Sequence, residues 1–278
     1  MTSALDPGVS RGATPDADNP PPRRDLGRTF VRGTGQTLLT IGLVALLFVV
    51  YQLWVTDLLA ARAQDQLSEE VQDRWAGSPT VTSPSAPADP AAPAPHTPAT
   101  IDVGVGDPFA ILHIPRLGED YARVVVEGAS EVQLEQGPGH YIGTAMPGEQ
   151  GNFAVAGHRV GRGSPFLHLD RMLPGDPIVV ETADSWFVYR VLGDPATGSF
   201  GGDPTGIPGR EIVRPSQVSV IAPTPGGPDG GSPTDAFLTL TTCHPKYSAE
   251  QRLIIHARLD GAPVSKATAP DGPPALLG

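Results

Sequence analysis

Three residues of different types, Cys243, His158 and Arg252, could together carry out acyl transfer. Cys243 is the only cysteine in the 278-residue chain, and a cysteine attacks a carbonyl as its thiolate. A neighbouring histidine can take the thiol proton and later return it to a leaving amine. An arginine stays protonated in proteins and cannot act as the base, but it can donate hydrogen bonds to the oxyanion of a tetrahedral intermediate. This set of residue types therefore indicates chemistry through a thioester.

The alternative for Cys243 is an inert thiol, because a free cysteine often packs in a core as a small hydrophobic residue. Side chains alternate between the two faces of a strand. In the segment AFLTLTTCHP, this alternation sets Leu238 and Leu240 against Thr239, Thr241 and Cys243. The cysteine thus shares a face with threonines rather than leucines, which favours a reactive thiol.

The same alternation places His158 and Arg252 on the polar faces of their own segments, GNFAVAGHR and QRLIIHARL. If the apolar faces fill the interior of a barrel, then Cys243, His158 and Arg252 all lie on its outer wall, each at the end of a strand. Small side chains would then floor the space beside them, namely Ala154, Ala156, Thr239 and Thr241.

The elements that must position these residues are mostly β. Glycines and prolines separate the expected strands as turns and loops would, and many short strands with few helices favour a closed barrel. One helix-like piece is expected at 164–172, with Ser164 as N-cap and Pro165 at the first position. The expected strands cover 109–114, 123–127, 153–158, 178–181, 186–192, 237–243 and 253–259.

These residues also resemble a known family. TLTTC at 239–243, AGHR around His158, and Arg252 nine residues after the cysteine resemble the signature of sortases. IPRLG at 114–118, GPGHY at 137–141 and SPFLHLD at 164–170 are similar to the actinobacterial class E subgroup. The resemblance covers about 107–260.

The resemblance implies a mainly β fold, an eight-stranded sortase-type barrel with short helices. It implies that the catalytic residues are His158, Cys243 and Arg252. His158 would follow the fourth strand, Cys243 would end the seventh and Arg252 would begin the eighth. It further implies a cysteine transpeptidase that cleaves a C-terminal sorting signal (LPxTG-like, LAxTG in class E) between Thr and Gly. The secreted protein bearing that signal would then pass to an amine of a peptidoglycan precursor.

Substrate preference stays open on two counts. Ile142 stands where the subgroup pattern has Pro, and 193–235, which corresponds to the substrate-contacting loop, is rich in Gly and Pro. A tyrosine near Tyr141 is associated in class E with alanine in LAxTG; the alternative is a rim aromatic with a hydrogen-bonded hydroxyl. We take Tyr141, Ala156, Thr239 and Thr241 as candidate substrate-binding residues.

The rest of the chain predicts a membrane anchor. The run TLLTIGLVALLFVVYQLWV at 37–55 has no charge and nearly the length of a membrane-spanning helix. Arginines precede it, so the N-terminus is expected in the cytoplasm and the compact domain outside. The alternative is a signal peptide cleaved near Ala61-Arg62-Ala63. The expected boundaries are a disordered segment at 1–33, an anchor at 34–56, a juxtamembrane helix at 57–76, a Pro/Ala-rich spacer at 77–106 that holds the next domain off the membrane, the catalytic domain at 107–260, and a disordered tail at 261–278.

Several function classes and residue roles are disfavoured. A net charge of -11 argues against nucleic acid as a partner, and no spacing typical of a metal site or cofactor is present. His244 is expected in solvent at a turn. His256 is expected to be exposed on its strand; the alternative is a supporting role behind the active site, because it shares the face of Arg252. No role is predicted for His96, His113, His140 and His168. Asp107-Pro108-Phe109 is similar to the lid of pilin sortases, but a strand start is the favoured interpretation.

Other wall-active functions remain as alternatives. An L,D-transpeptidase usually carries an SHGC-like run, which is absent here. Papain-like peptidases place Cys before His, whereas the expected base His158 precedes Cys243. A non-catalytic, anchored wall-binding module would favour tandem aromatic or basic repeats, which are absent.

Overall fold

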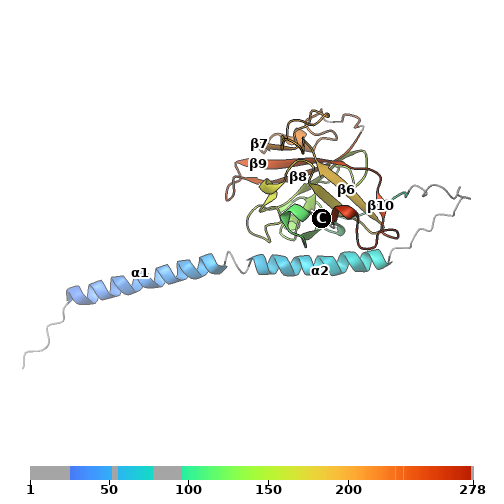
Figure 1. Cartoon of the computed structure of the whole chain (residues 1–278). Coiled ribbons are helices and arrows are strands. Elements are labelled where there is room, and N and C mark those ends of the chain that lie inside the picture. The colour runs from blue at the N-terminus through green and yellow to red at the C-terminus, as the bar shows by residue number, and fades with distance from the viewer. Residues whose placement is uncertain (1–25, 52–55, 78–95, 229, 234, 277–278) are drawn as a thin grey trace, which may run out of the picture. The chain divides into compact units, whose positions relative to one another are not determined.

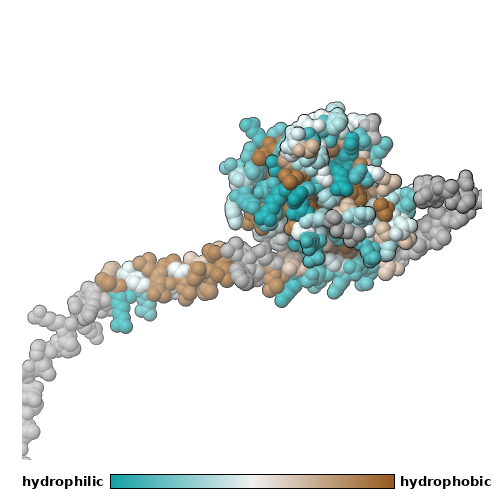
Figure 2. Space-filling view, viewed as in Figure 1, coloured by the Kyte–Doolittle hydropathy of each residue, from teal (hydrophilic) through white to brown (hydrophobic). Residues whose placement is uncertain are grey.

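The computed structural model describes residues 26–51, 56–77, 96–228, 230–233 and 235–276. The chain divides into two compact units, residues 1–49 and 50–278. The described part of the first unit belongs to helix α1 (Leu26–Val50). Its stretch Phe30–Val50, 21 residues long, is apolar and long enough to cross a bilayer, and Figure 2 shows hydrophobic side chains along most of it.

Helix α1 begins before the expected anchor boundary. Residues 26–33 were expected to be disordered but are helical, because extending an existing helix adds a hydrogen bond for each residue fixed. Threonines inside the helix bond their hydroxyls to carbonyls four residues back, at 3.0 Å for Thr34 and Thr37 and 2.9 Å for Thr40. These polar groups are therefore satisfied within the helix, as a lipid environment requires. The predictions for 1–25 and 52–55 lie outside the described residues.

The second unit contains a closed barrel (Figure 1). Eight strands pair around a ring in the order β6–β5–β1–β2–β3–β4–β8–β9, and β9 pairs with β6 to close it. This confirms the predicted eight-stranded barrel, and each expected strand is present. The ring strands are β1 (Pro108–His113), β2 (Ala122–Glu127), β3 (Gly139–His140), β4 (Gly151–Ala156), β5 (Pro177–Glu181), β6 (Ser185–Val191), β8 (Ala236–His244) and β9 (Gln251–Leu259).

Short elements decorate this ring. Strand β7 (Arg210–Val213) pairs with β9, and β10 (Val264–Ser265) pairs with β6. Neither was expected, since a run of two to four residues carries little periodic signal. The short helices are α3 (Glu131–Leu134) and the 3-10 turns η2 (Pro115–Leu117), η3 (Leu169–Arg171), η4 (Val218–Ile221) and η5 (Pro274–Leu276).

The barrel interior is filled by the apolar side chains that alternation assigned to it. Phe153 and Val155 of β4, Leu240 of β8, and Leu253 and Ile255 of β9 all belong to the main core. The opposite faces of these strands therefore point outward, as predicted.

Part of the outer wall of β4, β8 and β9 is nevertheless covered. Strand β7, which ends at Val213, and the chain after it fold over this part, so that Val213 and Val220 pack on Ile254. As a result Thr239 and Ala154 are completely buried, and His256, which was expected to be exposed, is completely buried as well. Strand alternation identifies the side of a strand on which a residue lies, but it contains no information about what packs there.

The expected helix at 164–172 does not form. Only the 3-10 turn η3 is helical there. Ser164 has φ 41°, whereas an N-cap residue has an extended backbone, so Ser164 does not cap a helix.

Helix α2 (Thr56–Gly77) packs against the barrel (Figure 1). Leu67 and Val71 are buried against Ile111, Val124 and Val126 of β1 and β2. We expected the spacer at 77–106 to separate the compact domain from what precedes it. However, α2 precedes the spacer in the chain and still packs on the barrel. The length of the spacer therefore does not set the distance between the barrel and the segment before the spacer.

The chain on both sides of the predicted catalytic domain is also ordered. His96 Nε2 lies 2.7 Å from Ser185 Oγ, within the expected spacer; residues 78–95 of that spacer lie outside the described residues. In the expected disordered tail, Ala269 O accepts a hydrogen bond from Trp186 Nε1 at 2.9 Å, and Lys266 Nζ lies 2.7 Å from Glu181 Oε1. These long-range contacts outweigh a local composition that favours disorder.

Candidate active site

Cys243 and Arg252 lie directly opposite each other on β8 and β9. Opposed residues of antiparallel strands have Cβ atoms about 5 Å apart, so the thiol and the guanidinium begin from adjacent points on one face. Both side chains are half-buried. The Arg252 Nη1 donates to the carbonyls of Ala249 and Gln251 at 2.9 and 3.0 Å, which anchors the side chain to the hairpin and leaves its remaining donors for other partners.

His158 reaches the same end of the barrel because β4 and β8 are parallel, with Ala156 opposite Thr241. Two residues further along each chain lie His158 and Cys243. Adjacent strands are about 4.8 Å apart, and the pairing continues past β4, where Gly157 N donates to Thr241 O at 3.0 Å. Counting ring strands alone, β8 is the seventh and β9 the eighth, as the resemblance implied.

The imidazole of His158 has an unusual environment. Its Nε2 is buried and has no hydrogen-bond partner among the described residues. Burial lowers the pKa of His158 below its ordinary 6.5, and the nearby Glu131 carboxylate opposes this shift. The neutral imidazole therefore predominates at neutral pH, with a ring nitrogen available to accept a proton. A buried polar atom without a partner is rare enough to require an explanation.

Arg159, to which we had assigned no role, is 3% exposed. Its Nη1 lies 3.3 Å from Cys243 O and 3.2 Å from His244 Nδ1. Its Nη2 forms an ion pair with Asp170 Oδ1 at 3.0 Å. His244, expected in solvent, is thus half-buried against this guanidinium. In the sequence, the signal for Arg159 was its place in the AGHR motif.

The candidate substrate-binding residues separate into two groups. The Tyr141 hydroxyl lies 3.0 Å from Thr241 Oγ1, two residues before Cys243 on the same face. Ala156, opposite Thr241, is 6% exposed. Thr239, in contrast, is completely buried, and its hydroxyl lies 2.8 Å from Asn152 Oδ1 and 2.9 Å from His256 Nδ1. The structure therefore leaves Thr239 no surface that a substrate could reach.

A second histidine, His140, supports the chain at Tyr141. It is completely buried, and its Nδ1 lies 2.6 Å from Glu127 Oε2. Its Nε2 lies 2.8 Å from the hydroxyl of Thr144, which donates to Tyr141 O at 2.8 Å. The sequence predicts no role for His140, because its partner Glu127 on β2 is brought to it only by the fold.

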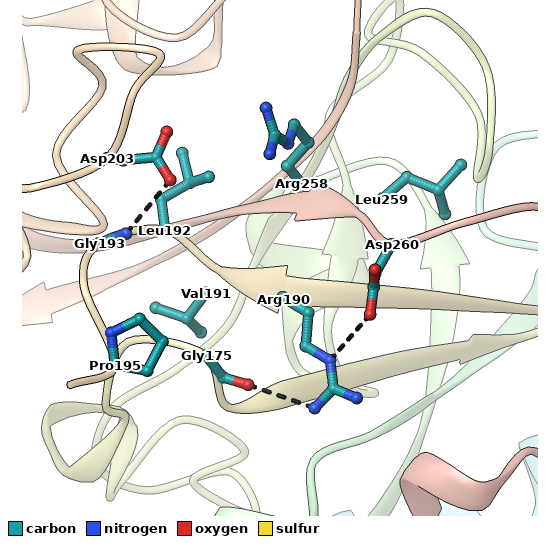
Figure 3. Close-up of a pocket in the computed structure, with 10 residues that line it drawn as sticks. All are labelled: Gly175, Arg190, Val191, Leu192, Gly193, Pro195, Asp203, Arg258, Leu259 and Asp260. Carbon is teal, nitrogen blue, oxygen red and sulfur yellow. Dashed lines mark hydrogen bonds and ion pairs between the residues drawn. The ribbon is translucent and has the colours of Figure 1, made fainter.

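A cavity of about 350 Å³ lies elsewhere on the barrel (Figure 3). Arg190 and Arg258 line it together with Asp203 and Asp260, and Arg190 Nε pairs with Asp260 at 3.1 Å. Arg258 lies six residues after Arg252 on β9, which corresponds to roughly 20 Å along a strand. This cavity is therefore remote from Cys243.

The sequence of this chain matches known families. The family described as the sortase domain matches residues 112–260. Sortase SrtE1 of Streptomyces coelicolor is 35% identical over 235 residues, which cover 82% of this chain and 56% of that protein. Sortase SrtE2 of the same organism is 33% identical over 247 residues, covering 85% of this chain and 86% of that protein. The chain thus spans just over half the length of SrtE1.

Solved structures agree. The SrtF sortase from Corynebacterium diphtheriae has a TM-score of 0.59 at 39% identity, covering 65% of this chain and 97% of that one. Sortase E from Streptomyces avermitilis has a TM-score of 0.50 at 36% identity, covering 62% and 99%. With the closed barrel and the arrangement of its motifs, these matches show that the chain belongs to the sortase family and is similar to its actinobacterial class E members.

Proposed function

We propose that this chain is a cysteine transpeptidase that cleaves a C-terminal sorting signal of LAxTG or LPxTG type between Thr and Gly. The observation that carries the proposal is the convergence of three groups at one barrel end. Cys243 is paired with Arg252 across β8 and β9. His158, whose Nε2 has no hydrogen-bond partner in the described part of the chain, follows the adjacent strand β4.

In the first half-reaction, Cys243 Sγ attacks the carbonyl carbon of the substrate threonine, and His158 accepts the thiol proton. Donors of Arg252 stabilise the oxyanion. The C–N bond then breaks, and His158 returns the proton to the leaving glycine amine. A thioester remains on Cys243.

In the second half-reaction, an amine of a peptidoglycan precursor attacks the thioester carbonyl. His158 removes the proton of this amine, the C–S bond breaks, and the Cys243 thiolate is reprotonated. Because burial lowers the pKa of His158, its imidazole is neutral at the start of each half-reaction in this proposal and can accept a proton.

The substrate groove is proposed to run beside Tyr141, Thr241 and Ala156. The Tyr141 hydroxyl is held by Thr241, so this aromatic ring has a defined place two residues along the strand from the nucleophile. A rigid ring at this point would limit the size of the side chain that can occupy the second position of the signal, which supports alanine there.

The proposed location is the outer face of a cell membrane. Helix α1 serves as a single-pass anchor in this proposal, its N-terminus is cytoplasmic because the preceding residues are rich in arginine, and the barrel is extracytoplasmic. The partners are secreted proteins bearing a sorting signal and the amine of the wall precursor.

The test uses the full chain in detergent with LAxTG and LPxTG reporter peptides, with and without an amine acceptor. Wild type is expected to cleave one peptide class and to join it to the amine, while Cys243→Ala is inactive. Thioester accumulation on Cys243 would be measured by mass spectrometry after acid quenching. Equal turnover by wild type and Cys243→Ala would refute the proposal, and so would the absence of any turnover by wild type.

A further inference from the structure

Arg159 is a charged side chain in a buried position. Its guanidinium is almost inaccessible to solvent, and the Nε is buried without a hydrogen-bond partner among the described residues. Burying a cation costs several kcal/mol unless it is paired. Here the partner is Asp170. Burial raises the pKa of the Asp170 carboxyl, but hydrogen bonding and the Arg159 charge outweigh this and hold it below its ordinary value, so the pair is ionised at neutral pH.

The contacts of Arg159 connect the two chain segments that carry the reacting groups. Its backbone directly follows His158, and its Nη1 reaches Cys243 O at 3.3 Å. On the other side of His158, Gly157 O accepts from Thr242 Oγ1 at 2.8 Å. Both neighbours of His158 are therefore bonded to the end of β8, within one residue of the nucleophile.

These hydrogen bonds are needed because the regular pairing of β4 with β8 ends before it reaches His158. Strand β4 ends at Ala156, and the chain after His158 runs through four consecutive residues with positive φ: Gly161 at 72°, Arg162 at 53°, Gly163 at 75° and Ser164 at 41°. Such a backbone costs energy at the non-glycine positions and persists only where surrounding contacts hold it. The hydrogen bond from Arg159 Nη1 to Cys243 O joins the chain to the end of β8 just before this loop.

We propose that Arg159 is a positioning residue of the active site. It keeps the His158 imidazole in register with the Cys243 thiol by holding the Cys243 carbonyl, and Asp170 holds the guanidinium in place. The proposal rests on the proposed function in so far as His158 and Cys243 are the reacting groups.

The residue type fits this role. An arginine presents several donors in a rigid fork, so it can reach two acceptors on different segments at once. A lysine at the same position is a single flexible ammonium and could keep the bond to Cys243 O or the pair with Asp170, but not both in fixed geometry. The substitution Arg159→Lys is therefore expected to be intermediate between wild type and a neutral replacement.

The experiment compares Arg159→Met, Arg159→Lys and Asp170→Asn in the full chain, with Arg171→Met as the matched control. Arg171 is an exposed arginine beside Asp170. A misplacement of about 1 Å costs about 100-fold in rate, so kcat for peptide cleavage should fall about 100-fold in Arg159→Met while KM changes less than about threefold. In Asp170→Asn, kcat should fall about tenfold. The effect is smaller because the half-exposed Asp170 carboxylate acts only through the Arg159 guanidinium.

Alkylation of Cys243 by iodoacetamide provides a readout that needs no peptide. It should slow about tenfold in Arg159→Met, because the imidazole no longer meets the thiol, and it should be unchanged in Arg171→Met. If wild type cleaves no peptide, the proposed function fails, and alkylation still decides the positioning role. Circular dichroism checks folding, and if Arg159→Met does not fold, Asp170→Asn decides. Folded variants with kcat within twofold of wild type and unchanged alkylation would overturn the proposal.

Discussion

The most informative single change outside the active site is Gln64→Ala on α2. The Gln64 side chain accepts a hydrogen bond from Val124 N at 2.8 Å and donates to Gln136 O at 2.7 Å. A longer contact joins its Nε2 to Val124 O at 3.4 Å. Strand β3 has two residues and pairs with β2 only at Val126 and Glu127. The side-chain amide of Gln64 thus replaces the missing strand partner of Val124.

The magnitude follows from these contacts. Two hydrogen bonds of normal length contribute about 1 kcal/mol each, and the Val124 N–H left in a partly buried interface costs about 1–3 kcal/mol if water does not reach it. The expected loss is about 2–5 kcal/mol of unfolding free energy. For a unit of about 200 residues each kcal/mol shifts Tm by about 2–4 °C, so Tm should fall by about 4–20 °C.

Thermal unfolding of the full chain in detergent measures this effect, and Gln66→Ala is the matched control. Gln66 is the same residue type on the same helix but is exposed, so both variants change helix propensity equally. Gln66→Ala should unfold within about 1 °C of wild type, as exposed substitutions usually do. If the two variants unfold at the same temperature, α2 does not stabilise the barrel through Gln64 and the reasoning is wrong.

Three other outcomes concern the site and the tail. Arg252→Lys should lower kcat/KM about 100-fold at unchanged Tm, as loss of an oxyanion donor does; full activity would exclude the oxyanion role. Because burial lowers the pKa of His158, the folded chain binds fewer protons there than the unfolded chain. The contribution of this shift to the free energy of unfolding is complete above pH 6.5 and is lost as the pH falls. The acid limb of the pH profile of kcat/KM should therefore have its midpoint below pH 6.5. A midpoint above pH 6.5 would contradict the lowered pKa of His158. Removing 261–278 should lower Tm, since Lys266 pairs with Glu181; a disordered tail would leave Tm unchanged.

The barrel and the residues that face its interior could be predicted from the sequence alone. The strands around Phe153, Leu240 and Ile255 alternate cleanly between apolar and small or polar side chains, and local alternation depends only on the pleat of a strand. Alternation likewise placed Cys243 and Arg252 on one outer face at strand ends, whereas their direct pairing across β8 and β9 is a finding of the structure.

What packs on the outward faces was decided by the tertiary structure. Thr239 and His256 have the sequence pattern of a solvent-facing wall, but they are buried because β7 and the chain after it fold over them. The docking of α2, through Gln64, and the ordered tail depend in the same way on partners far away in the chain. Irregular segments have no periodicity from which their contacts can be predicted.

The positions of Arg159 and Asp170 illustrate the same limit within the active site. They are eleven residues apart, and neither the motif nor the spacing indicates that one guanidinium joins Asp170 to the Cys243 carbonyl. The sequence by itself determined which residues can react and on which strands they lie. Only the tertiary structure decided which residues hold them together, because buried pairings depend on how distant loops return to the strand ends.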